Sequence, residues 1–454
     1  MRLKNLAFYL ARRPVLQVVP YWLAATLVGL LAVLYANVFD LCCSIVLEIF
    51  SSNQYLLLAL SPVCFFLAWF LVKKFAPHAA GSGIPQVMAA IECGSTHQNR
   101  FVKKVLGLKT ALIKIASSLL CILGGGAIGR EGPTIQISAT IFYFLGTKAN
   151  KIWPGLSHRP FIVAGGAAGV AAAFNTPLGG IIFAIEELMT AHFHNIKTVL
   201  IFAVLVAGLI AQWIMGPYLY FGFPSVAPVT FSAVPLALLV GALGGFFGAL
   251  FGHLLLVITH KKSQKLKKSS SAALFALASG VVIAIIAIVF GSTCIGPGKQ
   301  IITGFLFHEQ TATWGMIIGR FISSIVSYIS GCAGGIFAPS LAIGGALGSK
   351  LAQLAHSPDT NLMVLLGMIA FLTGVTRAPF TAFVLVLEMT DRHSAITLMM
   401  LSAVCAYGSS RIFGAHSFYD HAKAWLLEET SERGPKLLPQ KDQKSPAMLI
   451  KKNS

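Results

Sequence analysis

A glutamate stands in one of the most apolar stretches of the chain, within the motif GREGP at residues 129–133. The segment SSLLCILGGGAI precedes this motif, and TIQISATIFYFLG follows it. Burying a lone carboxylate in such surroundings is costly, so Glu131 needs either a compensating partner or a functional reason to be there. Arg130 is a poor partner, because adjacent side chains on one helix do not face each other.

Two other stretches share the glycine-rich, proline-terminated pattern of GREGP. They are GSGIP at 81–85 and GGIFAP at 334–339, and a helix-like run follows each. Glycine lets the backbone approach a ligand closely, and proline suits the first turn of a helix. Each stretch therefore predicts free backbone N–H groups at the positive end of a helix, which is a geometry that binds anions. A phosphate-binding P-loop is excluded, because no GK[ST] follows.

Glycines can also mediate close helix packing, which is the alternative explanation for such stretches. We adopt that explanation for Gly244, Gly248 and Gly252, which recur at four-residue spacing without a terminal proline. For the three proline-terminated stretches taken together, we favour anion binding.

The elements that position these motifs belong to an integral membrane protein. Hydrophobic residues make up 56% of the 454 residues and charged residues only 11%, whereas soluble domains carry about 25% charged residues. The net charge is +19, with basic residues clustered in short segments such as 260–268, and no Lys, Arg, Asp or Glu occurs from 198 to 260. This pattern follows the positive-inside rule and favours contact with membrane lipid over binding of nucleic acid.

Apolar segments cover nearly the whole chain and predict an all-α protein. Several segments reach only about 12–15 residues, too few to cross a bilayer, and glycine and proline clusters separate them. We therefore expect many tilted and broken helices. We assign residues 1–413 to a transport domain with halves at about 20–215 and 232–413, and residues 414–454 to a last helix and a short cytosolic tail.

An internal repeat relates the two halves. NTPLGGIIFAIEELMT begins at Asn175 and RAPFTAFVLVLEMT begins at Arg377, so that Glu186 and Glu388 occupy matching positions. GREGPT likewise pairs with GIFAPS, at nearly the same offset. A repeat with broken apolar segments at corresponding positions is typical of transporters whose site lies near the membrane midplane.

The motifs GSGIP, GREGP and GGIFAPS, in this order and spacing, resemble the three signature motifs of the CLC family of chloride channels and chloride/proton antiporters. FNTPLGGIIFAIEEL and TAFVLVLEMT are similar to further segments of that family. The resemblance extends from about residue 20 to 425. It implies the inverted-repeat CLC fold, of the prokaryotic type without regulatory CBS domains.

The resemblance also implies a set of anion-binding groups. Ser82 would offer its hydroxyl to a central anion, which the backbone N–H groups of Ile336 and Phe337 would also contact. Tyr419, in SFYDHAKAW, would complete this site with its hydroxyl. Backbone around Arg130 to Gly132 would form an outer anion site.

The same resemblance gives Glu131 a role as external gate and proton carrier. Ionised, it can occupy an anion site; protonated, it loses that attraction and admits chloride. Glu187 resembles the internal proton acceptor of antiporters, which channels usually replace with an apolar residue. Glu186 beside it is the third residue that we assign to gating and proton transfer. In the second half the counterpart of Glu187 is Met389, whereas Glu186 is matched by Glu388.

We therefore expect chloride/proton exchange across the inner (plasma) membrane by a multi-pass homodimer in contact with lipid. The main alternative is a passive voltage- or pH-gated chloride channel of the same family, and a cation-coupled carrier is a further one. A membrane-embedded enzyme is a remote alternative: HEQT at 308–311 lacks the second histidine of a zinc protease. The eight scattered cysteines form no CxxC pair, so neither zinc nor a disulfide framework is indicated. We expect no metal site and no cofactor.

Overall fold

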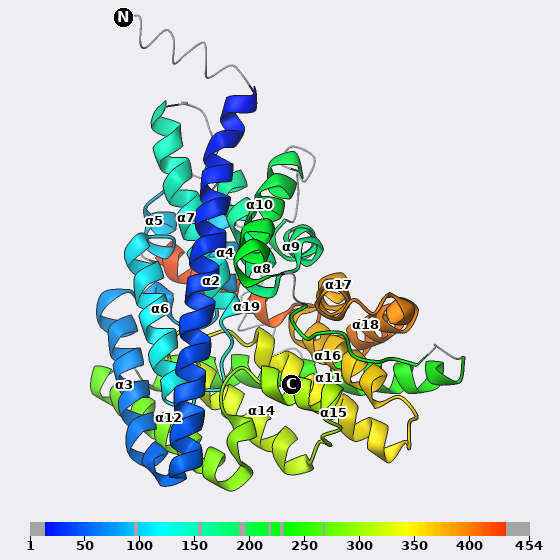
Figure 1. Cartoon of the computed structure of the whole chain (residues 1–454). Coiled ribbons are helices and arrows are strands. Elements are labelled where there is room, and N and C mark those ends of the chain that lie inside the picture. The colour runs from blue at the N-terminus through cyan, green and yellow to red at the C-terminus, as the bar shows by residue number, and fades with distance from the viewer. Residues whose placement is uncertain are drawn as a thin grey trace, which may run out of the picture.

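The computed structural model describes residues 14–94, 99–152, 157–189, 197–216, 219–227, 231–266 and 268–432. Within these ranges the regular secondary structure is helical, apart from two isolated backbone bridges. The prediction of an all-α protein with long, short and broken helices is confirmed (Figure 1). The charged tail beyond Glu432 lies outside the described residues.

Seven helical stretches in the described ranges are long and apolar enough to cross a membrane, as a multi-pass membrane protein requires. Large apolar side chains on these stretches, such as Leu34, Leu112 and Trp213, are more than half exposed, which suits contact with lipid. The helices that form the seven stretches are α2 (Pro14–Ser52), α3 (Leu57–Phe75), α5 (Asn99–Val105) with α6 (Leu108–Leu123), α10 (Lys197–Met215), α11 (Val234–Lys265), α12 (Ser269–Phe290) and α18 (Ile396–Ser410).

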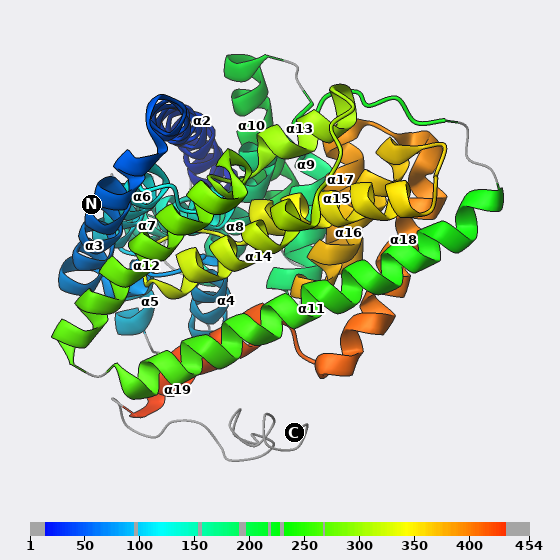
Figure 2. The ribbon, with the colours of Figure 1, turned by 90° about the horizontal axis from the view of Figure 1, so that it is seen from below.

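The long helices are steeply inclined to one another. Figure 2 shows α2 nearly end-on, while α11 runs lengthwise across the same view. Two such helices cannot both stand perpendicular to one membrane, so at least one of them is strongly tilted. Basic residues Lys262 and Lys265 end α11, on the face where α19 lies alongside it.

Shorter helices fill the interior between the long ones. Two of them form its centre: every residue from Phe161 to Phe174 and from Leu362 to Thr376 is buried. The helices outside the seven stretches, of which α7 with 22 residues is the longest, are α4 (Ile84–Cys93), α7 (Glu131–Ile152), α8 (His158–Phe174), α9 (Pro177–Phe183), α13 (Lys299–Phe307), α14 (Trp314–Ile329), α15 (Phe337–Leu354), α16 (Thr360–Thr376), α17 (Pro379–Thr390) and α19 (Phe418–Glu432). Single turns of 3-10 helix occur at Gln54–Leu56, Pro77–Ala79, Phe231–Ala233, Ser292–Cys294, His393–Ala395 and Arg411–Phe413.

The repeated sequence motif corresponds to a repeated backbone break. Helix α8 ends at Asn175, with φ 56°, and α16 ends at Arg377, with φ 63°, both in the left-handed region. Two residues later, Pro177 and Pro379 start α9 and α17. A left-handed residue stops the first helix, and the proline then starts the next in a new direction. The broken helices predicted from the sequence are present in both halves.

Candidate anion-binding site

Hydrogen bonds between backbone groups hold the three glycine-rich stretches together. Gly81 N–H donates to Cys332 O at 2.9 Å, and Gly334 N–H donates to Gly81 O at 3.0 Å. Gly129 and Gly335 exchange two N–H···O bonds, each of 2.8 Å. Because α4, α7 and α15 begin at or just after these stretches, the bonds bring three helix N-termini to one place in the interior.

Glycine is required where these stretches touch. A Cβ atom added to Gly132 would collide with Ser82 Oγ, and one added to Gly83 would stand 2.8 Å from Gly132 O. Gly83 also has φ 106°, which a side chain rarely tolerates. The close approach places the hydroxyl of Ser82 directly against the first turn of α7.

Buried polar atoms without a hydrogen-bond partner gather at this point. They are Ser82 Oγ, both carboxylate oxygens of Glu131 and the hydroxyl of Tyr419. The hydroxyls of Ser82 and Tyr419 face each other, yet they form no hydrogen bond of ordinary geometry. Buried polar groups in proteins are nearly always paired, so hydroxyl donors left open beside helix N-termini suit an anion.

The first turn of α15 completes the set of donors. Ile336 is the N-cap residue and Phe337 the first helical residue, and both are almost fully buried. Backbone N–H groups in the first turn of a helix have no acceptor within the helix. The Phe337 ring lies 5.6 Å from that of Phe174, and this contact helps to fix the end of the helix.

Glu131 is the first residue of α7, and its side chain folds back toward α15. A Cβ atom added to Gly129 would overlap Glu131 Oε2 and would lie 3.1 Å from Ala338 Cβ. The backbone N–H groups of Ala338 and of Glu131 itself face the carboxylate, although neither forms a hydrogen bond of ordinary geometry with it. The fully buried carboxylate thus lies where a helix N-terminus attracts negative charge.

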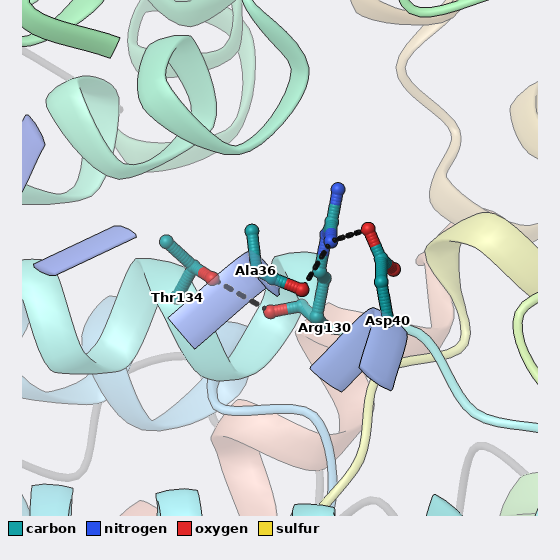
Figure 3. Close-up of polar contacts among 4 residues, drawn as sticks. All are labelled: Ala36, Asp40, Arg130 and Thr134. Atoms are coloured by element: carbon teal, nitrogen blue, oxygen red, sulfur yellow. Dashed lines mark hydrogen bonds and ion pairs between the residues drawn. The ribbon is translucent and has the colours of Figure 1, made fainter. Parts of the chain in front are cut away.

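The side chain of Arg130 reaches Ala36 and Asp40 of α2 (Figure 3). Its Nη1 donates to Asp40 Oδ2 at 2.7 Å and to Ala36 O at 2.9 Å. Its carbonyl oxygen accepts the hydroxyl of Thr134 at 2.8 Å. Among the described residues, Arg130 therefore forms its ion pair with Asp40 and not with Glu131.

Glu186 and Glu187 lie on one π-helical turn, Ala184–Leu188, that follows α9. The two carboxylates differ in their contacts. Glu186 accepts the N–H groups of Phe380 at 3.2 Å and Thr381 at 2.6 Å. Glu187 makes no hydrogen bond among the described residues, and the charged groups that act on it include Asp420 and Lys423.

Comparison with known proteins gives the family. The family model described as "Voltage gated chloride channel" matches residues 64–411. The chain belongs to this CLC family. The H(+)/Cl(-) exchange transporter ClcA of Vibrio vulnificus strain YJ016 is 28% identical over 421 residues, which cover 87% of each chain. ClcA of Citrobacter koseri is 30% identical over 400 residues, covering 83% of this chain and 80% of the relative.

Solved structures show the same fold. A slow cyanobacterial Cl-/H+ antiporter matches with a TM-score of 0.80 and 24% identity, covering 92% of this chain and 98% of the other. A CLC-type fluoride/proton antiporter matches with a TM-score of 0.74 and 21% identity, covering 88% and 96%. The CLC-type fold expected from the sequence is confirmed.

The structure adds one charged group to this CLC site that sequence reasoning missed. Lys114 on α6 is fully buried, and its Nζ donates to Gln136 Oε1 at 2.6 Å. A Cβ atom added to Gly83 would stand 3.0 Å from that same oxygen, so the pair lies directly behind the glycine-rich stretches. No carboxylate forms an ion pair with Lys114 among the described residues. A single lysine in the run TALIKIASSLL was the signal available in the sequence.

Proposed function

We propose that this chain exchanges chloride for protons across the inner membrane, with Glu131 as the external gate and proton carrier. One observation carries the proposal: a fully buried carboxylate without a hydrogen-bond partner lies among open donors at three helix N-termini. A structural carboxylate would be expected to have a partner in such a position. The relatives whose names describe H(+)/Cl(-) exchange support the same function.

The central anion is held by neutral donors. Its donors are the hydroxyls of Ser82 and Tyr419 together with the backbone N–H groups of Ile336 and Phe337. An outer anion lies against the backbone from Arg130 to Gly132. Neutral donors and helix ends bind a halide without neutralising it through an ion pair, so the anion can also leave. Lys114 lies behind the site, and its ammonium form would favour an anion in the pathway.

Glu131 couples the two ions because it competes with chloride for one place. When ionised, its carboxylate occupies the end of α15 beside Ala338 and closes the outer pathway. When a proton binds, the neutral side chain is no longer attracted to the helix end, and chloride takes its place. The proton leaves from the same oxygen toward the inner side, so that each cycle moves the two ions in opposite directions.

Glu187 receives this proton on the inner side. Its carboxylate is free of hydrogen bonds among the described residues and lies near Lys423 and Asp420 at the start of α19. A carboxylate at this position favours exchange, because a passive channel would have an apolar residue in its place. Glu186 was expected to share the proton role, but both of its oxygens are occupied by backbone N–H groups of α17. We therefore assign Glu186 to the join between α9 and α17.

The two halves, at about 20–215 and 232–413, form one transport unit, and residues 414–454 contribute its last helix. Matching backbone breaks before α9 and α17 support this division.

We also propose a homodimer. Leu178 and Phe380, in the first turns of α9 and α17, are exposed to 62% and 56% and offer an apolar surface for a second copy. Cross-linking of a cysteine placed at Leu178 in native membranes tests this contact.

Flux measurements test the proposed function. Purified protein is placed in liposomes that have an outward chloride gradient and no proton gradient, and chloride loss and external pH are recorded together. Exchange predicts that chloride efflux drives proton uptake into the liposomes against the growing proton gradient. Chloride efflux without proton movement would instead indicate the passive channel.

A further inference from the structure

A cavity of about 150 Å³ lies between α11, the end of α16 and the loop that leads into α19. Two of its lining residues, Phe418 and His421, belong to α19, which lies alongside α11 (Figure 2). Pockets for drug-sized ligands have roughly 300–1,000 Å³, so this cavity suits a small ligand. None of the residues assigned to the chloride and proton pathway lines it.

The polar lining of the cavity is basic. Three histidines, His253, His416 and His421, and the guanidinium of Arg377 line it, and its lining contains no carboxylate. Arg377 uses Nη1 to donate to Gly414 O at 3.0 Å. A guanidinium has five N–H donors, so this bond leaves several for a ligand. Four groups that can carry positive charge in one small cavity favour an anion with more than one negative charge.

The basic groups are close enough to repel one another when charged. The rings of His416 and His421 lie 5.9 Å apart, and Arg377 also acts on His421. Burial, followed by the charges of His416, Arg377 and His253, lowers the pKa of His421 below its usual range, while Asp420 acts in the opposite direction. Tyr407, Arg411 and Asp420 are the titratable groups that act on Arg377.

Asp420 does not line the cavity, but its negative charge acts on both His421 and Arg377 and offsets part of their positive charge. Its Oδ2 accepts the backbone N–H of Ser417 at 3.1 Å and the hydroxyl of the same residue at 2.9 Å. This arrangement closes the turn that begins α19. This one carboxylate, outside the lining, leaves an excess of positive charge on Arg377 and the three imidazoles when the imidazoles are protonated.

We propose that this cavity is a regulatory site for a small phosphate-type anion, either free phosphate or the phosphate group of a lipid. Two or more protonated imidazoles and the guanidinium would bind its oxygens. Binding draws a proton onto His421, since a dianion offsets the positive charges that lower the pKa of this residue. The affinity for the dianion, calculated from its concentration at each pH, should therefore increase as the pH falls from 7.5 to 6.0.

The cavity is connected to the chloride site through one side chain. Phe418 lines the cavity and immediately precedes Tyr419. Its ring lies 5.5 Å from that of Tyr328, whose hydroxyl is 3.0 Å from where a Cβ atom of Gly81 would stand. An anion that fixes the turn before α19 would restrict Tyr419 and the Gly81 loop together. We expect slower exchange, and this part of the inference depends on the proposed function.

Binding is tested without transport, by calorimetry of the detergent-purified full chain with inorganic phosphate at pH 6.0 and 7.5. The double variant His416→Gln/His421→Gln should weaken binding about tenfold or more, because it removes charge-assisted hydrogen bonds. His308→Gln, an exposed histidine that does not line the cavity, is the matched control and should bind as the unmodified chain does. Proton uptake on binding should be present in the control and reduced in the double variant.

A second arm separates the two sources of phosphate. Thermal stability is measured in nanodiscs of phosphatidylcholine with and without phosphatidic acid, and exchange is measured with phosphate on each side of the liposome. The site binds a lipid headgroup if phosphatidic acid stabilises the unmodified chain but not the double variant, and if inorganic phosphate does not bind. If the double variant and the control respond equally to both probes, or if neither probe has an effect on the unmodified chain, the proposed site is wrong. Binding that leaves the exchange rate unchanged would overturn only its regulatory role.

Discussion

Glu186 and Glu388 are bound reciprocally across the two halves of the molecule. Glu186, just after α9, accepts two backbone N–H groups at the start of α17, at 3.2 and 2.6 Å. Glu388, near the end of α17, accepts those of Leu178 and Gly179 at the start of α9, at 3.0 and 2.8 Å. The carboxylate near the C-terminal end of each short helix thus caps the N-terminus of the other helix. Negative charge at a helix N-terminus is stabilising.

The reciprocal caps predict a loss of stability when either charge is removed. Glu186→Gln and Glu388→Gln keep the side-chain shape but lose charge-assisted hydrogen bonds, so each should lower the free energy of unfolding by about 1–3 kcal/mol. Thermal unfolding in detergent measures the effect. Proton coupling should persist in both variants; a selective loss of coupling in Glu186→Gln would show instead that this residue carries protons.

Glu187→Val should abolish proton movement and leave chloride flux in place. The variant removes a carboxylate that has no hydrogen bond among the described residues, so folding should not suffer. Its counterpart in the repeat is Met389, already apolar, and Met389→Val serves as the matched control with normal coupling. Uphill proton uptake by Glu187→Val in chloride-loaded liposomes would exclude Glu187 as the inner proton acceptor.

Ser82→Ala tests the hydroxyl at the centre of the anion site. Ser82 Oγ has no hydrogen-bond partner within the described part of the chain, so its loss should not destabilise the fold. Loss of one neutral hydrogen bond should weaken chloride binding about three- to tenfold. Calorimetric titration with chloride measures this change. An unchanged affinity would place the central anion elsewhere.

Gln136→Glu tests the electrostatic role of Lys114. The new carboxylate would pair with the buried ammonium and cancel the positive charge behind the glycine-rich stretches. Chloride affinity should fall by about three- to tenfold, because the charge acts over a short distance in a medium of low dielectric constant. Gln136→Met, which also loses the hydrogen bonds of the Gln136 amide to His78 O and Val105 O but adds no carboxylate, is the matched comparison. Equal chloride affinity in Gln136→Glu and the unmodified chain would show that Lys114 does not contribute to anion binding.

Much of the architecture could be predicted from local sequence chemistry. Glycine and proline act on their own backbone, so GSGIP, GREGP and GGIFAP predicted loops followed by helix starts, and the structure has them. The repeat at Asn175 and Arg377 likewise predicted matching helix breaks, which the positive φ angles of both residues show.

Partners distant in the chain could not be predicted in this way. The bond from Arg130 to Asp40 joins residues 90 positions apart, and the Glu186 contacts join residues 194 and 195 apart. Such pairs depend on how helices pack, which no single-sequence pattern records. Lys114 was visible as a lone cation in an apolar run, but only its position behind the glycine-rich stretches connects it with anion binding.

The most direct test of the account is proton uptake driven by a chloride gradient in liposomes that contain Glu131→Gln. Glutamine keeps the shape of the side chain and removes its charge, so the variant resembles the gate with its proton bound. We expect chloride to pass without proton movement, and the pH dependence of chloride flux to be largely lost. Proton pumping at the rate of the unmodified chain would contradict the central claim that Glu131 is both gate and proton carrier.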